Sequence, residues 1–278
     1  MLLVRHLAHV EVSARPRVVA SGGFDGVHRG HQRVLGRLSA VARARRAEAV
    51  VAVRPRSGQP TLANLRQQLA LLGEWSVDSV VLLGGGDPTD EGMVAERLDA
   101  TVLVTGGAPT FTGGEVDSVE RVIEDGEPLS ADLVRTRLAA GDLAAVERAL
   151  GRCHAVEGPV VHGFHRGATI GIPTANLRVR RQALPPDGVY AVRVRHRGRE
   201  LSGAANIGYS PTFGNATRSV ETHVLDFDGN LYGERLEVAF VARLRGEEKF
   251  ASIEALVARI REDIAATRTL LSARGNGR

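Results

Sequence analysis

The chain has 278 residues, enough for two domains at the usual size of roughly 150 residues each. Hydrophobic residues make up 43% and charged residues 24% of it, a globular composition that excludes a disordered or collagen-like chain. The formal net charge is only +4, and aromatic residues account for 4% of the chain, so few rings are present to stack on bases. We therefore expect a protein that does not bind nucleic acid.

Several features point to a reducing compartment without a membrane. Cys153 is the one cysteine, which excludes an intrachain disulfide and a zinc site built from cysteines. The longest apolar runs, such as 80–83, are much shorter than the ~20 residues that span a bilayer. Arg5 and His6 interrupt what would be the apolar region of a secretion signal. We expect a cytoplasmic protein with no membrane partner.

The first half alternates short apolar strands with amphipathic helices. Strands are predicted at 17–20, 50–53, 80–83 and 101–104, and helical segments at 31–46, 62–72 and 92–98. This alternation is typical of an α/β fold, in which a parallel sheet carries helices on both faces. A further single helix is predicted from Asp132 to Leu150, ending at Gly151.

The periodicity changes to two beyond about residue 155. Strands at 189–194, 221–227 and 236–241 are bounded by Gly, Pro, Asn or Asp, which indicates a small antiparallel β-barrel. The chain closes with a predicted helix whose apolar face is formed by Ile253, Leu256, Val257, Ile260 and Ile264. We place the first domain at 1–152 and the second at 153–278.

A glycine-rich segment, Ser21–His31, lies between the first strand and the first helix. Glycines let the backbone approach a phosphate closely, and a helix N-terminus offers unpaired N–H groups. His28 and His31 lie one turn apart and could hydrogen-bond phosphate oxygens as negative charge builds up. The segment predicts a nucleotide site that includes Gly23, Phe24 and both histidines; the alternative is an ordinary turn with solvent-facing histidines.

The His28–His31 motif in this setting resembles the signature of the nucleotidyltransferase superfamily. The second half resembles the riboflavin kinase module through Gly171–Leu177, Pro186–Tyr190, Asn206–Gly208 with Pro211–Phe213, and Glu221–His223 before Asp226 and Phe227. Together the two halves resemble the prokaryotic bifunctional riboflavin kinase/FAD synthetase family over nearly the whole chain. The resemblance implies a Rossmann-like nucleotidyltransferase (FMN adenylyltransferase) domain followed by a β-barrel riboflavin kinase domain.

The resemblance implies that the second domain phosphorylates riboflavin with ATP and Mg²⁺, giving FMN, and that the first domain makes FAD from FMN and ATP. It makes Thr174 and Asn176 contacts of Mg-ATP; a hydroxyl and an amide oxygen are neutral hard ligands that suit a Mg²⁺ ion still carrying waters. It makes Glu221 the general base for the riboflavin 5′-hydroxyl. Gly171 and Pro173 belong to the same ATP-binding motif.

Two further segments are matched to the kinase pattern. Gly163, Arg166 and Gly167 resemble the loop over the nucleotide, with Ala168 where the family often has a basic residue. Residues of the C-terminal pattern, in which a loop and a helix help to enclose the flavin, are Arg245, Phe250 and Asp263. Helix capping and packing would explain these three equally well.

The first module departs from its family in three segments. Ala52–Ser57 stands where a Thr-Phe-x-Pro-His-Pro segment is usual and has no histidine, and Gly106–Thr112 lacks the acidic pair of a Gly-Glu-Asp-Phe-x-Phe-Gly segment. In Ser130–Arg135 two hydroxyls of a Ser-Ser-Thr-x-Ile-Arg motif are replaced, although Arg135 is kept as a nucleotide contact. Asp132 beside a triphosphate would be repulsive unless a metal intervened.

These departures leave two alternatives open. One is a riboflavin kinase whose first domain is inactive or uses another nucleotide. The other is a flavin-binding regulator without catalytic activity.

Overall fold

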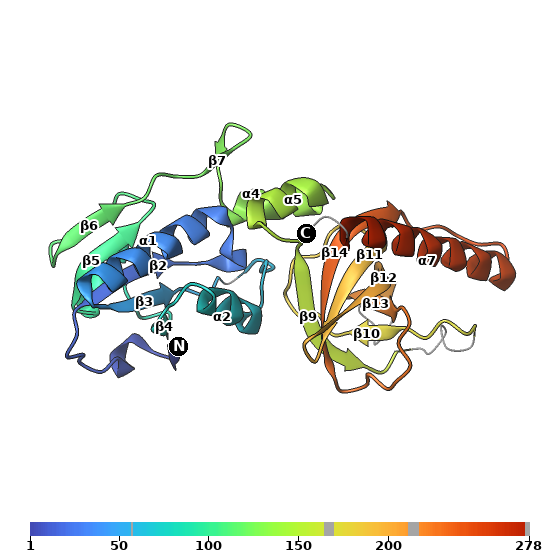
Figure 1. Ribbon diagram of the computed structural model, residues 1–278, viewed down its shortest axis with the longest axis horizontal. Helices are drawn as coiled ribbons and strands as arrows, with labels where there is room; N and C mark the ends of the chain where they lie inside the picture. Colours follow the sequence, from blue (N-terminus) through green and yellow to red (C-terminus); the bar gives the residue numbers. More distant parts are fainter. Residues whose placement is uncertain (57, 164–169, 211–216, 276–278) are drawn as a thin grey trace. The chain divides into compact units, whose positions relative to one another are not determined.

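The computed structural model describes residues 1–56, 58–163, 170–210 and 217–275 (Figure 1). Its contacts divide the chain into two compact units. The first comprises Met1–Val134 and Ala149–Gly151, and the second comprises Arg135–Arg148 and Arg152–Arg278. A single boundary after residue 152 stays a prediction, because the division assigns the stretch 135–148 to the second unit.

The first unit contains a six-stranded sheet in the order β1-β4-β3-β2-β5-β6. Every neighbouring pair is parallel, which confirms the predicted α/β fold. The strands are β1 (Leu2–Val4), β2 (Arg17–Gly22), β3 (Glu48–Val53), β4 (Ser79–Leu82), β5 (Ala100–Thr105) and β6 (Glu115–Ser118). The edge strands β1 and β6 were not predicted, because β1 has three residues and β6 is polar and largely exposed.

Successive residues of the central strands face two different cores, as the pleat of a strand requires. One face of the sheet packs against α1 (Arg29–Arg45) and α2 (Leu65–Gly73), and the other packs against α3 (Glu91–Arg97). On the first side Val18 and Val51 meet Leu35 of α1. On the second side Val19 meets Val94 of α3. The sheet is therefore covered on both faces, and its carboxyl edge carries the glycine-rich segment.

The predicted single helix from Asp132 to Leu150 is wrong. The structure has two helices, α4 (Ala131–Ala139) and α5 (Leu143–Leu150). Gly141 breaks the helix because its φ of +80° lies in the left-handed region. Asp142 then starts α5, since its carboxylate accepts a hydrogen bond from the Ala145 N–H at 2.9 Å. A short hairpin of β7 (Ile123–Glu124) and β8 (Glu127–Pro128) precedes α4.

The second unit is a closed barrel in the order β10-β13-β12-β11-β14-β9, with every neighbouring pair antiparallel, as predicted. Its strands are β9 (Ala155–Val161), β10 (Ala175–Leu177), β11 (Gly188–His196), β12 (Arg199–Ser210), β13 (Thr217–Val224) and β14 (Arg235–Arg245). The strand predicted over 221–227 ends at Val224, because the chain turns through Asp226 at a φ of +54°. Tyr190, Ile207 and Phe240 fill the barrel interior.

The terminal helix α7 (Ile253–Gly275) lies along the outer face of β11, β12 and β14 (Figure 1). Its predicted apolar face is only partly correct, since Ile253 is 64% exposed while Asp263 and Thr267 are buried. The barrel offers the helix a charged partner at this place, Arg245, so a carboxylate rather than an aliphatic side chain is buried there.

Candidate active sites

The glycine-rich segment after β2 turns through the left-handed region of the backbone. Phe24, Gly26 and Val27 have φ values of 45°, 70° and 41°. A β-branched residue such as valine rarely adopts this conformation, and tertiary contacts must hold it there. Asp25 supplies them, because its Oδ1 accepts hydrogen bonds from the Leu62 and Ala63 N–H groups at 2.8 and 3.2 Å.

The two histidines of this segment stack on each other at the start of α1. Their ring centroids are 3.6 Å apart, and Nδ1 of His28 accepts a 3.4 Å hydrogen bond from the His31 N–H. That acceptor role places the proton of a neutral His28 ring on Nε2, from which the ring can donate to a phosphate oxygen. Because the two rings stack on each other and His28 caps the helix, they are not the solvent-facing side chains of the alternative interpretation.

His31 contributes a half-buried, neutral ring. Burial, and to a smaller degree the charge of His28, hold the pKa of His31 well below its usual value. Within the described part of the chain its buried Nδ1 has no hydrogen-bond partner. Such an atom is costly unless a ligand or water satisfies it.

A cavity of about 500 Å³ opens over this turn, a size typical of ligand sites. It brings together four of the predicted residues, namely Gly23, Phe24, His28 and His31. All three segments that depart from the family pattern also contribute to its lining, through Arg56, Gly106 with Gly107, and Ser130 to Asp132. Arg135 lies on α4 in the second unit, and its nucleotide contact stays a prediction.

The cavity also holds charged residues that sequence reasoning did not assign. Glu91, at the start of α3, accepts a 2.6 Å hydrogen bond from the Thr105 hydroxyl, and burial raises the pKa of Glu91. Arg121 donates from Nε to the Gly106 carbonyl at 3.0 Å. A lone glutamate or arginine outside any motif gives no sequence signal, since most such residues are solvated.

Arg56 and Asp132 form an ion pair in this lining. Nη1 of Arg56 lies 2.8 Å from Oδ1 of Asp132. The expected repulsion between Asp132 and a phosphate is thus offset by an arginine from another departing segment. The sequence signal that could have indicated this pair is that one segment departing from the family pattern contains Arg56 and another contains Asp132, so a cation and an anion appear together.

In the second unit, strand register places Glu221 between two amides. Glu221 of β13 is directly opposite Asn176 of β10 on one side and Asn206 of β12 on the other. Opposed residues in antiparallel strands share a face of the sheet. The residues next to them in the strands, Ala175, Thr222 and Ile207, are buried in the barrel. The side chains of Glu221, Asn176 and Asn206 therefore lie on the outer face.

A second cavity, of about 340 Å³, lies on the opposite side of these strands. It is lined by Pro173, Thr174, the inward-facing Ala175 and Thr222, and the stretch 227–232, and its described lining does not include Glu221, Asn176 or Asn206. His223 stabilises the segment Gly171–Leu177 through a 2.8 Å hydrogen bond between its Nδ1 and the Pro173 carbonyl. The hydroxyl of Thr222 is buried and has no hydrogen-bond partner among the described residues, so the cavity carries an unsatisfied polar atom.

The remaining predicted nucleotide contacts divide into described and undescribed ones. Gly163 lies directly against the Asn176 side chain, and Gly171 has a φ of +76° that favours glycine. Arg166 and Gly167, together with Ala168, lie outside the described residues.

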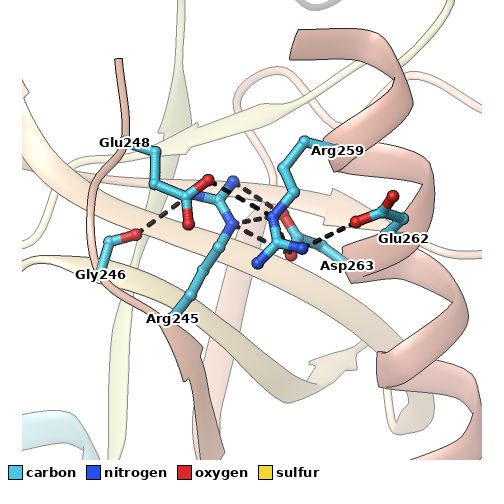
Figure 2. A network of polar contacts seen from close by, with 6 residues as sticks. All are labelled: Arg245, Gly246, Glu248, Arg259, Glu262 and Asp263. Atoms are coloured by element: carbon cyan, nitrogen blue, oxygen red, sulfur yellow. Dashed lines mark hydrogen bonds and ion pairs between the residues drawn. The ribbon is translucent and has the colours of Figure 1, made fainter. Parts of the chain in front are cut away.

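The residues of the C-terminal pattern form a polar network between β14 and α7 (Figure 2). Arg245 and Asp263 are joined by several contacts, the shortest being 2.8 Å, and their side chains are only 10% and 6% exposed. Arg259 adds contacts to Glu248 and Glu262. The Arg245 guanidinium also lies 5.7 Å from the centre of the Phe250 ring.

This network positions the loop 246–252 beside the polar outer face. A Cβ built on Gly208 of β12 would lie 2.3 Å from Oε1 of Glu247 and 3.3 Å from the amide nitrogen of Asn206. The loop therefore touches the strand that carries Asn206, one neighbour of Glu221.

Cys153 takes no part in these sites. Its burial and, to a smaller degree, Glu147 raise the pKa of its thiol to about 11 and keep it protonated.

Comparison with known proteins covers both units. A family model described as riboflavin kinase matches residues 150–271, and one described as FAD synthetase matches residues 10–84. The second match includes His28 and His31 and ends before the segments 106–112 and 130–135.

Curated relatives match almost end to end. A bifunctional riboflavin kinase/FMN adenylyltransferase from Pseudomonas fluorescens is 36% identical, and the alignment covers 97% of this chain and 98% of that protein. One from Escherichia coli (strain K12) is 33% identical over 88% of this chain and 90% of its own length.

A crystal structure of a protein from Streptococcus pneumoniae, described as a macrolide-efflux protein, superposes with a TM-score of 0.84 at 26% identity. It covers 96% of this chain and 98% of that one. In the described ranges of this chain, no helix is long and apolar enough to cross a membrane. The end-to-end relatives show that the chain belongs to the family of bifunctional riboflavin kinases/FMN adenylyltransferases.

Proposed function

We propose that the second unit transfers the γ-phosphoryl group of ATP to the 5′-hydroxyl of riboflavin, giving FMN and ADP. The observation that carries this proposal is the register that sets Glu221 between Asn176 and Asn206. A carboxylate held there can accept the proton of the attacking hydroxyl. Thr174 lies two residues before Asn176, directly ahead of β10.

Thr174 and Asn176 would hold the Mg²⁺ of Mg-ATP. Among the described residues no cluster of three or more His, Cys, Asp or Glu side chains could hold a metal by itself. That composition fits a magnesium ion carried mainly by substrate phosphates and water, with a few neutral oxygens from the protein. When bound, the ion would neutralise charge on the transferring phosphoryl group.

The first unit is proposed to join FMN to the AMP part of ATP. A phosphate oxygen of FMN attacks the α-phosphorus of ATP, the bond to the β-phosphate breaks, and pyrophosphate leaves. His28, His31 and the N–H groups at the start of α1 would stabilise the charge on the leaving group. Gly23 and Phe24 would line the phosphate site.

The test is chromatographic analysis of products from riboflavin with Mg-ATP and, in parallel, from FMN with Mg-ATP. Glu221→Gln should lower the rate of FMN formation about 100-fold or more, as expected for a lost general base, while FMN is still converted to FAD. His28→Ala should show the reverse pattern. FMN formation at the native rate in Glu221→Gln would remove Glu221 from the role of base.

The same assay decides between the alternatives. FMN without FAD would identify a kinase whose first unit is inactive or uses another nucleotide, and assays with other nucleoside triphosphates would expose the latter. Flavin binding without any product would identify a regulator. Because both reactions consume ATP, we propose that the protein acts in the cytoplasm, without a nucleic-acid or membrane partner.

A further inference from the structure

We infer that Arg56 binds phosphate oxygens of the nucleotide in the cavity of the first unit, and that those oxygens displace Asp132 from Arg56. Arg56 is thereby a phosphate-binding residue, and Asp132 competes with the nucleotide for it. The inference rests on the proposed adenylyltransferase function of this unit and names two residues that act in it.

The geometry brings both side chains to the nucleotide site from distant parts of the sequence. Arg56 follows β3, Asp132 lies in the first turn of α4, and 76 positions separate them. Their 2.8 Å contact is part of the cavity lining that also contains His28 and His31. A phosphate bound over the histidines therefore lies in the same cavity as the guanidinium.

The charge of the lining gives Arg56 its importance. The described lining residues include four carboxylates, Asp25, Glu91, Glu120 and Asp132, against two arginines, Arg56 and Arg121. Arg121 is engaged with the Gly106 carbonyl. A polyphosphate entering this site needs a cation, and Arg56 has its guanidinium at the end of a side chain that is 44% exposed.

The exchange of partners is favourable on magnitude. Asp132 is 56% exposed, and ion pairs exposed to this extent contribute only about 0–1 kcal/mol. An arginine binds a phosphate with two parallel charge-assisted hydrogen bonds, which are stronger than a single contact to a carboxylate. Arg56 can therefore leave Asp132 at small cost and gain more from the nucleotide.

Alanine variants of the two partners test this by the direction of their effects. In the FMN to FAD reaction, Arg56→Ala should raise the KM for ATP about 10-fold, the equivalent of one charge-assisted contact. Asp132→Ala should lower the KM about 2- to 5-fold, because the competitor for Arg56 is gone. A purely structural ion pair would instead make both variants worse.

The chain offers a matched control. Arg45 and Glu115 form an ion pair whose side chains are 42% and 54% exposed, nearly as exposed as the tested pair, and neither residue is part of the lining. Arg45→Ala should leave the KM for ATP unchanged. The rate of FMN formation from riboflavin should be native in all three variants. Equal effects of Arg56→Ala and Arg45→Ala, or shifts of the same sign in Arg56→Ala and Asp132→Ala, would overturn the inference.

A binding measurement separates this inference from the proposed function. Calorimetry with inorganic pyrophosphate should show an affinity about 10-fold weaker for Arg56→Ala than for the native chain. Suppose that the native chain makes no FAD but binds pyrophosphate, and that Arg56→Ala binds it more weakly. In that case the proposed function fails and the role of Arg56 stands. If the affinity of Arg56→Ala equals that of the native chain, or the native chain does not bind pyrophosphate, the role of Arg56 is wrong.

Discussion

Gly163 lies so close to Asn176 that a Cβ atom on the glycine would stand 2.3 Å from the amide nitrogen and 2.5 Å from the amide carbon of that side chain. Real Cβ atoms do not make contacts this short, because repulsion rises steeply below van der Waals distance. The absence of a side chain at position 163 therefore sets the place of the Asn176 amide, and through strand register the place of the amide relative to Glu221.

A methyl group at position 163 should therefore disturb the kinase and spare the adenylyltransferase. We expect Gly163→Ala to push the Asn176 side chain away and to raise the KM for Mg-ATP in riboflavin phosphorylation about 10-fold, the cost of one good ligand contact. FAD formation from FMN should be unchanged. Steady-state kinetics of both reactions measure this.

Gly73→Ala is the control for a harmless glycine substitution, because its added Cβ meets nothing within 4 Å. The explanation fails if Gly163→Ala phosphorylates riboflavin with native KM and kcat.

The buried ion pair between Arg245 and Asp263 predicts a large loss of stability when one partner is removed. Asp263→Ala should lower the free energy of unfolding by about 3–5 kcal/mol, because it leaves the Arg245 guanidinium buried without its carboxylate. Urea unfolding of the full chain measures the loss. Arg268→Ala removes an exposed pair with Asp226 and should cost far less. Equal costs for the two variants would contradict this account.

The buried imidazole of His154 predicts a loss of stability in mild acid. Burial lowers the pKa of His154 to about 4, while the unfolded chain has a histidine pKa near 6.5. Below about pH 6.5 the unfolded state binds a proton that the folded state does not, so the contribution of His154 is complete above that pH and is lost as the pH falls towards 4. By about pH 5 the loss should reach about 2 kcal/mol.

His154→Gln tests this, since the amide can still donate to the Ala183 carbonyl, which the Nε2 of His154 contacts at 2.8 Å. Urea unfolding at about pH 7.5 and pH 5 should show a smaller difference in unfolding free energy for the variant than for the native chain. His31 shifts in the same direction and remains in both proteins, so the comparison isolates His154. Identical differences in the two proteins would be the contrary result.

The helix 132–150 shows where reasoning from the sequence was wrong. Its residues have helical propensity throughout, apart from Gly141, and a glycine inside a helix usually costs only about 1 kcal/mol. The break became visible only from the left-handed φ of Gly141 and the cap supplied by Asp142. The prediction of the apolar face of α7 was only partly right for a related reason. The burial of Asp263 depends on its partner Arg245, which lies 18 positions away in the sequence.

The sequence by itself determined the alternation of strands and helices in the first half, the change from a parallel sheet to an antiparallel barrel, and the motifs around His28 and Glu221. Periodicity and local motifs depend on neighbouring residues, so the sequence alone carries them. Only the tertiary structure decided that Glu221 stands between Asn176 and Asn206, and that Arg56 meets Asp132. Both relationships join residues far apart in the chain, and strand register and cavity geometry, which arise only when the core packs, bring them together.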